Sequence, residues 1–84
     1  MTLTFPNRSR SYDETRERVR FIGHDGMFEV RFSVETNALS TATDDEAHYL
    51  AAFDAARTTI HDVAREIYRN ARKTEYVLTA ADFR

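Results

Sequence analysis

Arg57 lies between Phe53 and Ile60 on the apolar side of a predicted helix, where burial of a charged side chain is unfavourable. A charge in that position must reach solvent or find a partner. It could bind an anion or carboxylate beside a β-hairpin. It could also pair with Asp54, Asp13 or a backbone carbonyl, and we favour this pairing. Arg57 is therefore a candidate binding residue with a simple structural alternative.

Tyr12 and Asp13 are the second candidates, because a phenol beside a carboxylate can carry out acid–base chemistry. Such a pair more often anchors a loop, with the tyrosine packed and the carboxylate capping the next turn, and we favour that interpretation. An enzyme would require a pocket that gathers Arg57, Tyr12 and Asp13.

Other catalytic or metal chemistry has little support in the residue types. The chain contains no cysteine, and its histidines (His24, His48 and His61) are too far apart in sequence for the usual paired ligands on one helix. The only glycines, Gly23 and Gly26, form no phosphate-binding loop. We therefore predict a protein that is not an enzyme and that holds no metal and no cofactor.

Arginines near the N-terminus suggest a nucleic-acid interface as an alternative. Five of them fall within residues 7–20 together with three acids, which leaves a net charge of +2 there; the arginines are Arg8, Arg10, Arg16, Arg18 and Arg20. The whole chain has a net charge of −2, and no aromatic motif typical of RNA-binding sheets is present. Nucleic acid is therefore disfavoured as a partner.

The clearest β pattern covers residues 18–35. Val19 and Phe21 alternate with charged residues, and an Asp25-Gly26 turn leads into a second alternating run, Met27–Glu35. In that run one set of side chains should face a core: Phe28, Val30, Phe32 and Val34. The other set should face solvent: Met27, Glu29, Arg31, Ser33 and Glu35.

A single amphipathic helix is predicted from Asp44 to Arg72, with Thr43 as its N-cap and Glu46 completing a capping box. Its apolar side contains Tyr49, Leu50, Phe53, Ala56, Ile60, Val63, Ala64, Ile67, Tyr68 and Ala71. Shorter elements are predicted on either side: strands at Leu3–Phe5, Ser11–Asp13 and Glu75–Leu78, and turns at Asp13–Glu17, Thr36–Ser40 and Thr79–Asp82.

Together these elements predict one α+β domain over residues 1–84. A small antiparallel sheet, consisting of the β-hairpin and one or two further strands, should pack on one long helix. That helix would be roughly 43 Å long, whereas the second hairpin strand spans only about 30 Å. The apolar side of the helix would then overhang the sheet, covered either by the N-terminal segment or by a second subunit, and we favour the second subunit.

The chain also resembles a known family of short bacterial proteins, the domain-of-unknown-function 1488 family. The resemblance covers nearly the whole chain and implies a small α+β fold, but no activity and no site residues. It rests on Phe5-Pro6, Ser11-Tyr12-Asp13, Val19-x-Phe21-x-Gly23, Asp25-Gly26, Val30-x-Phe32-x-Val34, Ala38-Leu39 and the helical residues Phe53, Arg57, Ile60, Ala64 and Tyr68.

We therefore predict a non-enzymatic protein-interaction module that forms a homodimer or binds another protein, with a nucleic-acid-binding accessory protein as the alternative. The N-terminus lacks the basic and apolar regions of an export signal, and no run of residues is apolar enough to span a membrane. The expected location is the cytoplasm, without a membrane partner.

Overall fold

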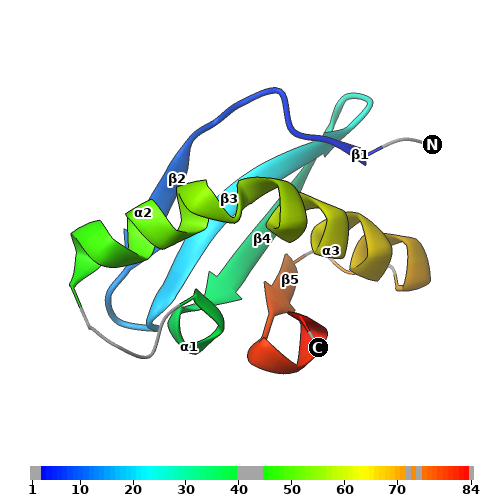
Figure 1. Ribbon diagram of the computed structural model, residues 1–84. Coiled ribbons are helices and arrows are strands. Elements are labelled where there is room, and N and C mark those ends of the chain that lie inside the picture. Colours follow the sequence, from blue (N-terminus) through cyan, green and yellow to red (C-terminus); the bar gives the residue numbers. More distant parts are fainter. Residues whose placement is uncertain (1–2, 40–44, 72, 74, 84) are drawn as a thin grey trace.

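A computed structural model describes residues 3–39, 45–71, 73 and 75–83. Its fold is α+β, and the described strands form one five-stranded sheet (Figure 1). The strands are β1 (Leu3–Thr4), β2 (Arg10–Asp13), β3 (Arg18–Asp25), β4 (Phe28–Glu35) and β5 (Glu75–Leu78). Both β1 and β2 pair with β3, which is followed across the sheet by β4 and β5.

The predicted hairpin is confirmed as β3 and β4, which are antiparallel with Val19 opposite Val34 and Phe21 opposite Phe32. These four side chains and Val30 are buried on one face of the sheet. The turn between the strands contains Gly26, whose φ of 63° lies in the left-handed region that glycine adopts without strain. The alternating pattern therefore predicted the core face of the hairpin correctly.

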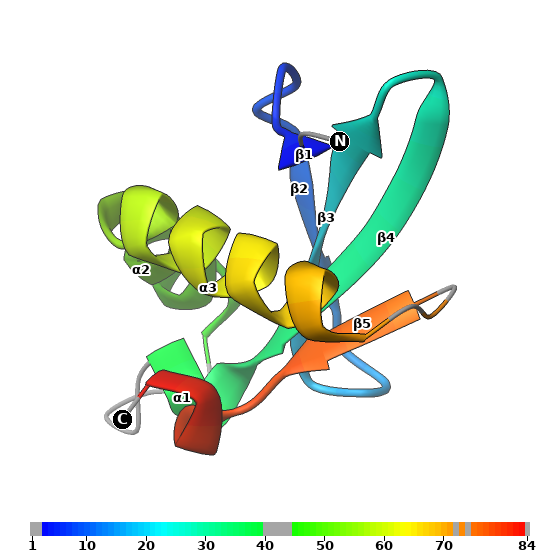
Figure 2. The same cartoon turned by 90° about the vertical axis from the view of Figure 1, so that its right-hand side faces the viewer.

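Two positions of the hairpin differ from the pattern. Phe28 was predicted to face the core, but it is 72% exposed because the end of the hairpin projects beyond the helices (Figure 2). Ser33 was predicted to face solvent, but it is buried although it lies on the face opposite the core. A period of two assigns a face to each side chain, but it does not say what covers that face.

The sheet is mixed, so the prediction of an antiparallel sheet was wrong at one edge. β5 runs parallel to β4, with Phe32 opposite Tyr76 and Val34 opposite Leu78. The chain leaves the end of β4, crosses one face of the sheet in its helices, and returns to pair beside β4 in the same direction. A crossover of this kind joins parallel strands, whereas a tight turn joins antiparallel ones.

The helical region is also divided, so the prediction of one long helix was wrong. It consists of α2 (Glu46–Ala55) and α3 (Arg57–Asn70), which are separated at Ala56. Asp45 caps α2 by accepting a hydrogen bond from the Ala47 N–H. The predicted cap Thr43 and the predicted helix ends Asp44 and Arg72 lie outside the described residues. The shorter helices are α1 (Thr36–Leu39) and a 3₁₀ turn, η1 (Ala80–Phe83).

The break at Ala56 lets the helices follow the twisted sheet. Figure 1 shows α2 and α3 crossing the same face in succession; α2 lies against β2 and β3, and α3 lies against β5. Tyr49, Phe53, Ile60 and Ala64 are buried against the sheet. The large apolar side chains exposed among the described residues are Ile22, Met27 and Phe28, all in the hairpin, so the described helices expose none. Of the two predicted covers for the apolar side of the helix, the N-terminal segment lies against α3.

The N-terminal segment packs between the sheet and α3. The Phe5 ring stacks on the His61 ring at a centroid distance of 3.9 Å, and the Arg65 guanidinium lies 5.2 Å from the centroid of Phe5. Arg65 Nε also donates a hydrogen bond to the backbone oxygen of Leu3. These contacts hold β1 and Phe5 over Gly23 of β3, where the missing side chain leaves room for them.

Replacing Gly23 with alanine should destabilise the protein by about 1–3 kcal/mol, the usual range for overpacking a filled core. The new Cβ would lie 2.8 Å from Phe5 Cε1 and 3.0 Å from Leu3 Cδ1, so the N-terminal segment must shift. Urea unfolding measures the cost. The same substitution in a Phe5→Ala background should cost less, because the nearest atom is gone. Equal costs in both backgrounds would argue against this packing.

Candidate binding face

The sheet is covered by α2 and α3 on one face, and no described helix covers the other face (Figure 2). We call this second surface the open face. By strand alternation it presents side chains from the four longer strands. They are Ser11, Asp13, Arg18, Arg20, Ile22, His24, Glu29, Arg31, Ser33, Glu35, Glu75 and Val77.

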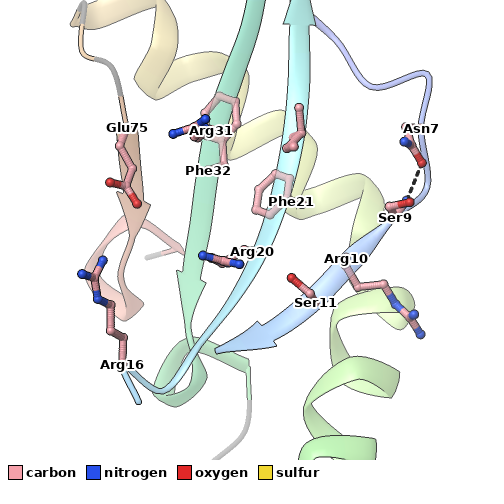
Figure 3. A pocket seen from close by; sticks show the side chains of 11 residues that line it. Asn7, Ser9, Arg10, Ser11, Arg16, Arg20, Phe21, Arg31, Phe32 and Glu75 are labelled. Atoms are coloured by element: carbon pink, nitrogen blue, oxygen red, sulfur yellow. Dashed lines mark hydrogen bonds between the residues drawn. The ribbon is translucent and has the colours of Figure 1, made fainter. Parts of the chain in front are cut away.

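A hollow of about 610 Å³ lies on the open face. Figure 3 shows Arg20 on β3 and Arg31 on β4 near its centre, with Arg16 and Glu75 at the β5 side. Its lining residues are Asn7, Ser9, Arg10, Ser11, Arg16, Arg20, Phe21, Ile22, Arg31, Phe32 and Glu75. Basic and hydroxyl side chains therefore dominate the polar part of the lining.

Arg20 and Arg31 are diagonal neighbours across the hairpin. Arg20 is opposite Ser33, and Arg31 is opposite Ile22, so the two arginines are one step apart along the same face. Diagonal neighbours of this kind have Cα atoms about 7–8 Å apart, within reach of long side chains. Within residues 3–39, 45–71, 73 and 75–83, neither guanidinium forms a hydrogen bond or ion pair, although Glu75 is opposite Arg31.

Two more polar atoms on this face are buried without a partner among the described residues. They are the Ser33 hydroxyl oxygen and Arg18 Nε. Ser33 lies directly across from Arg20, and Arg18 precedes Arg20 by two residues on the same face of β3. Because burying a donor without a partner costs about 1–3 kcal/mol, such atoms commonly mark a place where a ligand or water supplies the missing bond.

The candidate Arg57 forms the structural pairing that we favoured. Its Nη2 donates a hydrogen bond to Asp54 at 2.7 Å, and Asp54 also accepts two hydrogen bonds from Arg10 at 3.0 and 2.8 Å. These bonds, first that from Arg10 and then that from Arg57, hold the pKa of Asp54 below its usual value. The cluster ties β2 to the junction between α2 and α3, beside the break at Ala56.

The candidates Tyr12 and Asp13 lie on opposite faces of β2, because adjacent strand residues alternate. Tyr12 faces the helices and stacks with Tyr49 at a centroid distance of 5.6 Å. Asp13 lies on the open face and accepts a hydrogen bond from the Arg16 backbone N–H, as a turn-capping carboxylate does. The structure therefore does not bring Arg57, Tyr12 and Asp13 into one pocket.

The five arginines within residues 7–20, which suggested a nucleic-acid interface, do not form one continuous basic surface. Arg18 is half-buried, and Arg10 borders the hollow but turns its guanidinium toward α2 (Figure 3). Arg16 and Arg20 line the hollow as well. Their neighbour there is Arg31, which sequence reasoning placed on the exposed side of β4 without considering it as a site residue. The alternation of β4, combined with the register of the hairpin, would have placed Arg31 beside Arg20 on the same face.

A buried carboxylate also escaped sequence reasoning. The sequence predicts a hairpin turn at Asp25-Gly26, but Asp25 is the last residue of β3, is only 3% exposed and accepts a hydrogen bond from the Tyr68 hydroxyl. The bond ties the end of β3 to the C-terminal part of α3. Elsewhere, no three histidine or carboxylate side chains among the described residues gather closely enough to hold a metal ion.

The fold and the open face define a small α+β domain with a half-covered sheet. The protein family described as "Protein of unknown function (DUF1488)" matches residues 3–79, and the chain belongs to this family. No curated protein and no solved structure matches the chain. No helix in the described part of the chain has the length and apolar composition needed to cross a membrane.

Proposed function

We propose that the protein is a non-enzymatic interaction module that contacts a partner protein with the open face of its sheet. The observation that supports this proposal is the hollow on that face, where Arg20 and Arg31 flank the partly exposed Ile22 and Arg16 lies at the β5 side. A mixture of arginines and apolar side chains is typical of the surfaces with which proteins bind one another.

The arrangement of the candidate residues favours binding over catalysis. Arg57 is held by Asp54, Tyr12 packs on Tyr49, and Asp13 caps a turn, so each has a structural role. Nucleic-acid binding has weaker support, since acidic side chains of β4 and β5 share the open face and the chain has a net charge of −2.

Site-specific photo-crosslinking in the native host tests the proposal. A photoreactive phenylalanine analogue replaces Ile22 on the open face, and a matched variant carries it at Thr58, an exposed position on α3. We expect protein adducts at position 22 and none at position 58. An adduct of twice the mass of the chain would identify the partner as a second copy. The absence of adducts at position 22, or equal adducts at both positions, would refute the proposed interaction face.

A further inference from the structure

We infer that the open face binds two carboxylate side chains of an extended acidic segment, one on Arg20 and the other on Arg31. This inference rests on the proposed function and specifies the chemistry of the partner. Both guanidinium groups are exposed, and neither has a carboxylate partner within the described residues. Arginine binds carboxylates with two parallel hydrogen bonds, a geometry that a free guanidinium offers without rearrangement.

The spacing of the two arginines matches a strand. Residues two apart in an extended chain are about 6.7 Å apart and point to the same side. The diagonal pair Arg20 and Arg31 is separated by about 7–8 Å along the sheet. The Cα atoms of acidic residues at positions i and i+2 of an extended segment are therefore separated by nearly the same distance as the Cα atoms of the two arginines.

The surroundings favour a protein segment over a polyphosphate. Ile22 is opposite Arg31 and is 37% exposed, so an apolar side chain of the ligand has a contact between the two ion pairs. Acidic side chains border the same face at Asp13, Glu35 and Glu75, and the chain has a net charge of −2. These charges repel a long polyanion but tolerate one or two carboxylates.

Within the described part of the chain, the Ser33 hydroxyl and Arg18 Nε are buried without partners beside Arg20. A ligand would reach either atom only if the side chain above it moved. Repulsion between Arg20 and Arg31, which have no neutralising partner in the described part of the chain, also decreases when an anionic ligand binds.

Fluorescence anisotropy with a labelled peptide of about 12 residues tests this inference; the peptide consists of threonine and valine with two glutamates at positions i and i+2. The control peptide replaces every glutamate with glutamine. We expect binding of the acidic peptide only, weakened as salt rises from about 50 to about 300 mM. Arg20→Gln and Arg31→Gln should each weaken binding by about tenfold or more. Arg69→Gln is the matched control, since Arg69 is exposed on α3 and 72% accessible in its pair with Glu66.

Three results would overturn the inference: no binding of the acidic peptide, equal binding by both arginine variants and the wild type, or tighter binding of a single-stranded oligonucleotide that the same variants abolish. The last result would identify a phosphate-binding face. Crosslinks at position 22 without binding of the acidic peptide would leave the interaction module in place and refute only its acidic partner. Circular dichroism of each variant should match the wild type, because both arginines are exposed.

Discussion

Replacing Phe32 with alanine should lower the free energy of unfolding by about 3–5 kcal/mol. Phe32 is 2% exposed and lies at the centre of an aromatic cluster, with ring centroids of Phe5, Phe21 and Tyr76 at 5.8, 5.3 and 5.2 Å. Truncation would remove a large buried surface and leave a cavity that stacked rings cannot easily fill. A chain of this length has a total stability of roughly 4–13 kcal/mol, so much of it would be lost.

Phe28 provides a matched control for this experiment. It is the same residue type, on the same strand and by alternation on the same face, but it is 72% exposed. Phe28→Ala should therefore change stability by no more than about 0.5 kcal/mol. Urea unfolding of both variants measures the difference. Similar losses for the two phenylalanines would contradict the position of the hairpin end beyond the helices.

Lowering the pH from about 7.5 to about 5 should destabilise the wild-type protein by about 1–2 kcal/mol through His61. Burial lowers the pKa of His61 to about 4, and the neighbouring cations Arg57, Arg65 and Arg8 add to this effect against the opposing charge of Asp62. The unfolded chain has the ordinary value of about 6.5 and binds the proton first. Stability is therefore full above pH 6.5 and falls as the pH drops toward 4. The range given allows for solvent around the half-buried ring.

The variant His61→Phe isolates this contribution. Phenylalanine keeps a ring for stacking on Phe5 but cannot be protonated. Between the two pH values, the urea midpoint of the variant should change less than that of the wild type. Both proteins contain His24 and His48, so the difference between them reports on position 61 alone. Parallel pH profiles would mean that another group causes the acid sensitivity. This pH range lies above the lowered pKa of Asp54, so the Asp54 carboxylate stays ionised throughout the experiment.

Much of the local structure could be predicted from patterns of apolar and polar residues within single short segments. The alternation from Val19 to Val34 predicted the hairpin, and the helical spacing of Phe53, Ile60 and Ala64 predicted the buried side of the helices. These predictions succeeded because burial of one face depends mainly on neighbours two, three or four residues away.

The candidate site was predicted less well. Arg57 was correctly expected to pair with Asp54. The sequence did not show that Arg10, 44 positions before Asp54, also donates hydrogen bonds to this carboxylate. Arg20 and Arg31 become neighbours only through the register of β3 and β4. No local pattern reports whether two arginines on different strands share a face, and none reports whether a carboxylate will reach them.

By itself the sequence determined the α+β class, the hairpin, the apolar sides of the helices and the membership of the family. Tertiary structure alone decided the break at Ala56, the parallel pairing of β5 and the exposure of Phe28. It also decided the open face, whose two central arginines have no partner in the part of the chain that the structure describes. The physical reason is that periodicity records which side of an element is apolar. The twist of the sheet and the path of the returning chain determine what each side meets.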